Sequence, residues 1–225
     1  MYTHILFDLD GTISDPGPGI TKSVQYALRA EGIEVKDPKV LEKFIGPPLV
    51  DSFMEFYGFD EQRALRAVEK YRERFSKVGM YENTLYPGMR ELLTGLKRDG
   101  FHLAVASSKP EYFVTKILGY FGILECFEAT VGSELDGRRS RKEEVVEEAL
   151  RRLFLEKEIA YDATVMVGDR KFDILGAREM GLPAIGVAYG YAPEGELKAC
   201  APWAIASDVE ELGRILRTPL GGVIL

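Results

Sequence analysis

The stretch that decides the fold is HILFDLDGT, residues 4–12. Its apolar first half has the length and composition of a buried strand, and it ends in two aspartates, Asp8 and Asp10. Gly11 permits a sharp exit from that strand. The aspartates have the same parity, so both side chains can face one pocket. Close carboxylates repel each other unless a cation lies between them, so the stretch predicts a hard divalent ion, Mg2+ above others.

The chain changes character after this strand. Turn residues fill segment 14–19, and helical patterns then succeed one another without a strand from about Pro16 to Tyr81. The longest of these helices is predicted after Asp60, a good N-cap residue. Four residues are expected on its buried face: Leu65, Val68, Tyr71 and Phe75. A run of helices inside an otherwise alternating chain predicts an inserted all-helical domain, residues 16–81.

Helices and strands alternate from Tyr86 onward. Buried strands are expected at 102–106, 127–131, 164–167, 184–187 and 204–205, and the helices include 110–120 and 141–154. This alternation is typical of an α/β fold with a parallel, doubly wound sheet and helices on both of its faces. The predicted core domain therefore takes in residues 1–15 and 82–225.

Polar residues follow three of the predicted strands. After the first come Asp8 and Asp10, after the second Ser107, Ser108 and Lys109, and after a third Asp169 and Asp173, while Lys142 opens a helix. The carboxyl ends of parallel strands meet at one edge of the sheet, so these side chains are expected in one site. Carboxylates can supply a nucleophile and a general acid, and a metal and a lysine can offset charge on a phosphoryl group. The set therefore favours phosphoryl transfer.

Each of these signals has a simpler interpretation when taken alone. Two aspartates in a loop are often solvated, the serine pair at 107–108 could be a helix cap, and Lys142 has arginines for neighbours. Their joint occurrence at strand ends, in this order, is what favours a site. The rest of the basic cluster at 138–142 is predicted to be a solvated loop.

The four motifs resemble those of the haloacid dehalogenase-like hydrolase superfamily. The resemblance covers nearly the whole chain and implies a Rossmann-like core with a helical cap inserted after the first motif. It is closest to the phosphoglycolate-phosphatase-like and bacterial 5'-nucleotidase-like members. The form GDRKFD at 168–173 and the SKP at 108–110 look more like the 5'-nucleotidase-like branch.

The resemblance also implies roles for individual residues. Asp8 would be the nucleophile, and Asp10 would protonate the leaving oxygen and later activate water. Mg2+ would be held by Asp8, the backbone carbonyl of Asp10, Asp169 and, directly or through water, Asp173. Ser107 and Lys142 would hold the transferring phosphoryl group. Further candidates for substrate binding are Thr12, Ser108, Lys109, Lys43 and Arg170, the last two as specificity contacts.

Composition limits the partners. The net charge of −7 argues against a general nucleic-acid or membrane-surface binder but permits a small phosphorylated metabolite. Cys126 and Cys200 have no disulfide or metal-type spacing, which fits a reducing cytoplasm. The chain reaches its first strand almost at once and carries no membrane-length apolar run, so no signal peptide or membrane segment is expected.

The motifs together predict a Mg2+-dependent phosphate monoester hydrolase that acts through an aspartyl-phosphate. Its substrate would be a small metabolite such as a nucleoside monophosphate or phosphoglycolate. Two alternatives remain at this stage: a phosphosugar mutase, which would use the same two aspartates, and a non-catalytic regulatory protein. The cap is expected to open and close about linkers near 14–19 and 82–87.

Overall fold

The computed structural model describes residues 2–154 and 160–218 of the chain. The chain divides into two compact units, one made of Met1–Ser14 with Leu85–Leu225 and the other of Asp15–Thr84. We refer to them as the core unit and the helical unit. The chain crosses between them at strands β2 (Ser14–Asp15) and β3 (Thr84–Leu85), which pair in a two-stranded sheet. That the units act as a catalytic core and a moving cap stays a prediction.

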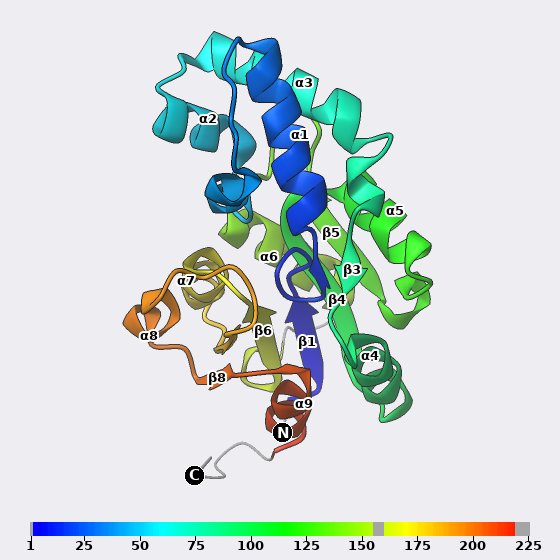
Figure 1. The fold of residues 1–225 in the computed structure, drawn as a ribbon. Coiled ribbons are helices and arrows are strands. Elements are labelled where there is room, and N and C mark those ends of the chain that lie inside the picture. The colour runs from blue at the N-terminus through cyan, green and yellow to red at the C-terminus, as the bar shows by residue number, and fades with distance from the viewer. Residues whose placement is uncertain (1, 155–159, 219–225) are drawn as a thin grey trace. The chain divides into compact units, whose positions relative to one another are not determined.

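The core unit is built on a six-stranded parallel sheet in the order β5-β4-β1-β6-β7-β8 (Figure 1). The strands are β1 (His4–Phe7), β4 (His102–Pro110), β5 (Ala129–Ser133), β6 (Thr164–Gly168), β7 (Ala184–Val187) and β8 (Ala204–Ala206). The order reverses direction beside β1, so this strand stands at the topological switch point, where α/β sheets bind their ligands.

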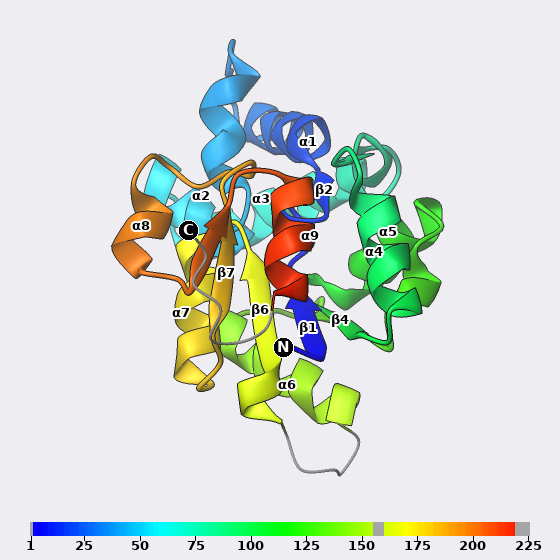
Figure 2. The same cartoon turned by 90° about the horizontal axis from the view of Figure 1, so that it is seen from below.

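Helices cover both faces of this sheet. They are α4 (Met89–Arg98), α5 (Glu111–Tyr120), α6 (Lys142–Phe154), α7 (Lys171–Glu179), α8 (Glu196–Cys200) and α9 (Val209–Arg217), with 3-10 turns at Leu124–Cys126 and Tyr161–Ala163. Figure 2 shows α6 and α7 on one face and α4, α5 and α9 on the other, and α8 packs against α7. The prediction of a doubly wound α/β core with a helical insertion is confirmed.

The central position of β1 follows from its sequence. Ile5, Leu6 and Phe7 are fully buried, because helices lie on both faces of the strand. Phe7 is in register with Val105 of β4 and with Val167 of β6. The residues that follow these three therefore emerge side by side at the carboxyl edge of the sheet.

The helical unit has its own hydrophobic core. Its elements are α1 (Gly17–Ala30), α2 (Leu49–Tyr57) and α3 (Glu61–Phe75), with 3-10 helices η1 (Pro38–Phe44) and η2 (Gly79–Tyr81). Phe44 and Phe53 are buried and lie edge to face, with ring centroids 5.0 Å apart. Asp60 caps α3 by accepting a hydrogen bond from the backbone N–H of Arg63 at 2.7 Å, as expected. Leu65, however, is 49% exposed.

Three details of the expected pattern were wrong. The buried stripe of α3 runs through Ala64, Val68 and Tyr71, so Leu65 lies beside it and not within it. Strand β4 continues to Pro110, because that proline is extended (φ −54°, ψ 130°) and not the first residue of α5. Strand β5 begins at Ala129, two residues later than expected.

None of the helices in the described part of the chain has both the length and the apolar character that spanning a bilayer requires.

Candidate active site

Three carboxylates, from the end of β1, the end of β6 and the first turn of α7, meet at the switch point of the core unit. They belong to Asp8, Asp169 and Asp173, each offers an oxygen within 4.8 Å of the others, and all three side chains are buried. Asp8 follows β1, and its backbone N–H donates to Val167 O of β6 at 2.9 Å. Asp173 lies in the first turn of α7 and accepts a hydrogen bond from the backbone N–H of Arg170 at 3.0 Å. The sequence-predicted carboxylates of β1 and β6 are therefore brought together.

One lysine ammonium lies against this group. Lys142 is the first residue of α6, and its side chain is 5% exposed. Its Nζ is 3.0 Å from Asp8 Oδ1 and 2.7 Å from Asp173 Oδ1, and it donates to the backbone carbonyl of Ala106 at 3.0 Å. Lys142 is thus not the surface lysine that its arginine-rich surroundings suggest. When all three carboxylates are ionised, they and Lys142 together carry a net charge of −2.

Burial and crowding shift the pKa values of this group. Burial raises the pKa of Asp169 well above its ordinary range, and the neighbouring Asp173 and Asp8 raise it further. Burial also raises the pKa of Asp173 to about 6, although Lys142 acts in the opposite direction. Burial by itself would lower the pKa of Lys142, but Asp173 and Asp8 outweigh it and hold that pKa above its ordinary value. The group is strained by like charge and would gain from a cation.

Three glycines let the backbone close around the carboxylates. A Cβ atom on Gly168 would lie 2.2 Å from Asp173 Cγ, and one on Gly11 would lie 2.2 Å from Asp169 Oδ2. One on Gly190 would lie 2.3 Å from Asp169 Cβ and 2.4 Å from the carbonyl oxygen of Gly11. No L-side chain fits at these distances, so glycine is required by close approach.

The donor set suits a hard divalent cation. Asp8 Oδ1 and Asp173 Oδ1 are buried and accept no well-aligned hydrogen bond, although both face the ammonium group of Lys142. Buried oxygens without such bonds, carried by carboxylates that repel one another, match the all-oxygen coordination that Mg2+ and similar ions prefer. Asp8, Asp169 and Asp173 would hold the ion. The carboxylate of Asp10 lies outside this group, so its predicted part in metal binding rests on its backbone carbonyl.

Asp10 has a different partner. Its Oδ2 lies 2.6 Å from Nζ of Lys109, and the two side chains are 10% and 7% exposed. Burial raises the pKa of Asp10, and Lys109 opposes this shift. The two aspartates that follow β1 therefore have different lysine partners: Lys142 contacts Asp8, and Lys109 contacts Asp10.

This arrangement agrees with the comparison to known proteins. The family model described as "haloacid dehalogenase-like hydrolase" matches residues 5–187, from β1 to the end of β7. The chain belongs to the haloacid dehalogenase-like hydrolase family. The resemblance of its four motifs is thus confirmed, and so is the prediction of an enzyme of this family.

Several relatives of this hydrolase are closely similar. It is 47% identical over 217 residues to a 5'-nucleotidase of Pseudomonas aeruginosa, with 96% of each chain covered. It is 30% identical to a phosphoglycolate phosphatase of Vibrio vulnificus, with 92% of this chain and 93% of the relative covered. The solved structure of a predicted phosphatase from Clostridium acetobutylicum is 46% identical, with a TM-score of 0.91 over 96% of this chain and 98% of that one.

Other predicted site residues of the hydrolase lie close by. Ser107 is 2% exposed and follows Ala106, whose carbonyl accepts a hydrogen bond from Lys142. The hydroxyl of Thr12 is buried and donates to Asp169 Oδ1 at 3.4 Å. The carbonyl of Ser108 accepts a hydrogen bond from the hydroxyl of Ser133 at 2.9 Å. Substrate contacts by Thr12, Ser108 and Lys109 stay predictions, and the structure adds protein partners for each.

The two predicted specificity residues have protein partners as well. Arg170 forms a two-point contact with Glu196 of α8, at 2.9 Å from Nε and 3.3 Å from Nη2. Glu196 also accepts the backbone N–H of Lys171 at 3.0 Å, so it holds the first residue of α7. In the helical unit, Nζ of Lys43 lies 4.3 Å from the ring centroid of Phe56.

Sequence reasoning missed the segment at 188–191, Ala-Tyr-Gly-Tyr. The backbone N–H of Tyr191 donates to Asp169 Oδ2 at 2.7 Å, and the hydroxyl of Tyr189 donates to the carbonyl of Thr12 at 3.1 Å. Gly190 lies between them against the backbone of Gly11. The signal was available, because this segment follows strand β7 and must lie at the same edge of the sheet.

Proposed function

We propose that this hydrolase is a Mg2+-dependent phosphomonoesterase that acts through a phosphorylated Asp8. The observation that carries this proposal is the position of Asp8 at the end of β1, 3.0 Å from the buried ammonium of Lys142 and beside two further carboxylates. A carboxylate in this position can act as the nucleophile. The positive charge beside it would stabilise the negative charge of the phosphoryl group that it attacks.

The reaction balances with two aspartates. An oxygen of Asp8 attacks phosphorus, the bond from phosphorus to the ester oxygen breaks, and Asp10 gives its proton to that oxygen. Asp10 then takes a proton from water, the water oxygen attacks phosphorus, and the bond between phosphorus and Asp8 breaks. The products are an alcohol and inorganic phosphate, and both carboxyl groups return to their first state.

The remaining groups bind and orient. Lys142 and the hydroxyl of Ser107 hold the oxygens of the phosphoryl group, and Lys109 fixes the carboxylate of Asp10 by the 2.6 Å contact. When bound, Mg2+ supplies positive charge that stabilises the phosphoryl oxygens. Thr12 and Tyr191 orient Asp169 through hydrogen bonds to its two oxygens. Such support at each ligand oxygen is typical of metal sites.

The first substrate class to test is the nucleoside monophosphates. The support is the 47% identity over nearly the full length to a protein named 5'-nucleotidase. Phosphoglycolate comes second, because the similarity to the phosphatase of that name is lower, at 30%. We propose that Lys43 and Arg170 contribute to this choice of substrate.

The test is phosphate release by the purified chain from nucleoside monophosphates, phosphoglycolate and sugar phosphates, with Mg2+ or with EDTA. We expect Mg2+-dependent release with the highest kcat/KM on a nucleoside monophosphate, and none from Asp8→Asn. Equal activity of Asp8→Asn and wild type would overturn the covalent mechanism. Isomerised sugar phosphate without phosphate release would instead show a mutase.

A further inference from the structure

Arg139 differs from the other arginines of its segment. The side chains of Arg138 and Arg141 are 76% and 68% exposed, whereas that of Arg139 is 17% exposed. The prediction of a solvated loop was therefore wrong for Arg139. Its backbone is left-handed, with φ +53°, a conformation that is unfavourable for an L-residue with a side chain. Contacts made by its side chain must offset that cost.

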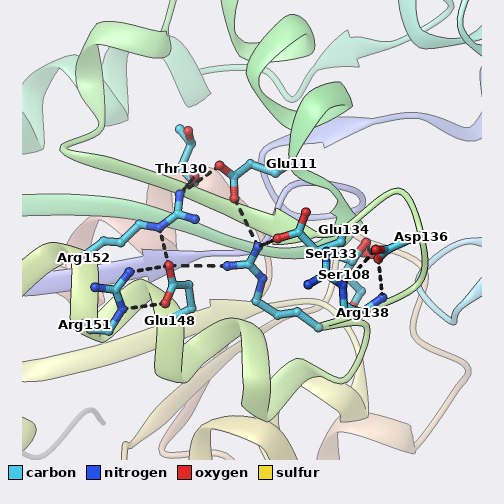
Figure 3. A network of polar contacts seen from close by, with 11 residues as sticks. Ser108, Glu111, Thr130, Ser133, Glu134, Asp136, Arg138, Glu148, Arg151 and Arg152 are labelled. Atoms are coloured by element: carbon cyan, nitrogen blue, oxygen red, sulfur yellow. Dashed lines mark hydrogen bonds and ion pairs between the residues drawn. The ribbon is translucent and has the colours of Figure 1, made fainter.

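Arg139 belongs to a closed ring of alternating charges, whose other members, Glu111, Glu148 and Arg152, are labelled in Figure 3. Its guanidinium lies 3.9 Å from Glu111 Oε2 and 3.4 Å from Glu148 Oε1. Arg152 closes the ring, with Nη1 2.9 Å from Glu111 Oε1 and Nε 2.6 Å from Glu148 Oε1. Arg139 also pairs with Glu134, the residue that follows β5. Because the charges of the ring balance, it can hold its shape without a ligand.

The ring joins the two elements that carry the phosphate-binding groups. Glu111 is the first residue of α5 and directly follows β4, which supplies Ser107. Glu148 and Arg152 lie on α6, which begins at Lys142, and Arg152 also donates to the carbonyl of Thr130 in β5 at 3.2 Å. The ring therefore sets the start of α6 relative to the start of α5.

The loop that leads into α6 has few other anchors to the sheet. Its backbone bonds are internal: Glu134 N–H donates to Arg138 O at 2.8 Å, and Gly137 N–H donates to Glu134 O at 3.1 Å. Ser133, just before the loop, is tied to the carbonyl of Ser108. At the other end, Arg139 stands three residues before Lys142 and is tied to three carboxylates.

We infer that Arg139 is a positioning residue for Lys142: it holds the loop so that the lysine meets Asp8. This inference rests on the proposed function for its kinetic consequence but not for its structural one. Lys142 has three acceptors at 2.7–3.0 Å, and a small shift of the helix start would lengthen all of them. Misplacement of about 1 Å can cost a hundredfold in rate.

The kinetic test compares Arg139→Ala with Arg138→Ala and Arg141→Ala, which remove the same charge from the same segment. With p-nitrophenyl phosphate and Mg2+, Arg139→Ala should lower kcat on the order of 10-fold to 100-fold with KM changed about threefold at most. Both controls should stay within about twofold of wild type. Arg139→Lys should recover part of the loss. If Arg139→Ala does not fold, Glu111→Gln, which weakens one contact of the ring, should lower kcat in the same sense.

A second readout does not depend on activity. In protein labelled with 15N-lysine, the buried ammonium of Lys142 should give its own NH3+ signal, assigned by its loss in Lys142→Arg. We expect Arg139→Ala to shift or broaden this signal and Arg138→Ala to leave it unchanged. An unchanged signal in Arg139→Ala, or kcat within twofold of wild type, overturns the inference. A shifted signal in a chain that releases no phosphate from any ester would sink the proposed function and leave the positioning role standing.

Discussion

Two polar clusters of the core unit each include residues of helix α6, and the two clusters differ in their balance of positive and negative charge. At the start of the helix, Lys142 contacts Asp8 and Asp173, which belong to a group of three buried carboxylates, so negative charge is in excess. Further along, Glu148 and Arg152 join Arg139 and Glu111 in a ring with equal numbers of positive and negative groups. The first cluster is buried and crowded, and the second is half-buried.

The difference shows where binding capacity lies. The balanced ring has partners for its charges within the protein, so its role is to hold elements in place. The carboxylate group has more negative charge than its lysine can offset, and burial prevents water from compensating for the remainder. Imbalance in a buried site is costly unless a ligand completes it, which is what a metal and a phosphoryl group would do.

The largest effect on activity is expected when the proposed nucleophile, Asp8, is removed. Asp8→Asn should lower kcat by about a thousandfold or more, because amide nitrogen and oxygen cannot form the phosphoryl intermediate. It also relieves repulsion, so its free energy of unfolding in EDTA should equal or exceed that of wild type. Steady-state kinetics and urea unfolding measure the two effects. Activity within tenfold of wild type would contradict the role of Asp8.

Removal of the Lys142 ammonium should destabilise the carboxylate group strongly. Lys142→Met leaves Asp8 and Asp173 buried without their ammonium partner, and we expect a loss of about 3–5 kcal/mol of unfolding free energy in EDTA. Urea unfolding measures this loss. Adding Asp173→Asn to Lys142→Met should restore part of it, since it removes one of the orphaned charges. A double variant less stable than Lys142→Met would count against charge excess as the cause.

The pH dependence separates the metal-free and metal-bound states. The pKa of Asp173, about 6 in the fold against 3.8 ordinarily, means that the fold favours its neutral form. Its contribution to stability is therefore fully present below about pH 4 and lost as the pH rises through 6, on the order of 3 kcal/mol.

Mg2+ should reverse this loss. The rise in melting temperature on adding Mg2+ should be larger near pH 7.5 than near pH 5, because protons compete with the ion for the same oxygens. Thermal unfolding with Mg2+ or EDTA at both pH values measures the difference. An equal rise at the two pH values, or the same pH dependence in Asp173→Asn, would exclude Asp173 as the group responsible.

A pair of glycine substitutions tests the packing around the carboxylates. Gly190→Ala places a Cβ 2.4 Å from the carbonyl of Gly11 and should cost about 1–3 kcal/mol and weaken the response to Mg2+. Gly119→Ala, in α5 where nothing lies within 4 Å of the added atom, should stabilise by about 0.5–1 kcal/mol. Chemical unfolding of both variants gives the comparison, and equal effects would argue against the close approach at Gly190.

Among the destabilising substitutions, the smallest effect is expected in the ring. Glu148→Gln removes a carboxylate whose pKa is lowered to about 2 by hydrogen bonds from Arg151 and Arg152, so its contribution is present above pH 4.5 and lost as the pH falls through 2. Because the ring is partly solvated, we expect about 1 kcal/mol at neutral pH. The difference in unfolding free energy between wild type and Glu148→Gln should be smaller near pH 2.5 than near pH 7.

Sequence patterns predicted which side chains would gather at one edge of the sheet, because strand ends are local. The apolar run of β1 predicts a buried strand, and the sheet topology then brings Asp8, Asp169 and Lys142 to one edge. The same logic applies to the loop at 188–191, which follows β7 and so lies at the same edge of the sheet. It could not find Glu196 or Arg139, whose partners are far away in sequence and carry no periodic signal.

The sequence by itself therefore determined the class of fold, the family and the strand ends where chemistry collects, since periodicity and turn residues act over a few neighbours. Tertiary structure alone decided which lysine serves which aspartate and which arginine of the segment at 138–141 turns inward. Those choices depend on distances of a few ångströms between elements that are many residues apart. Residue types along a chain do not encode such distances until the whole core has packed.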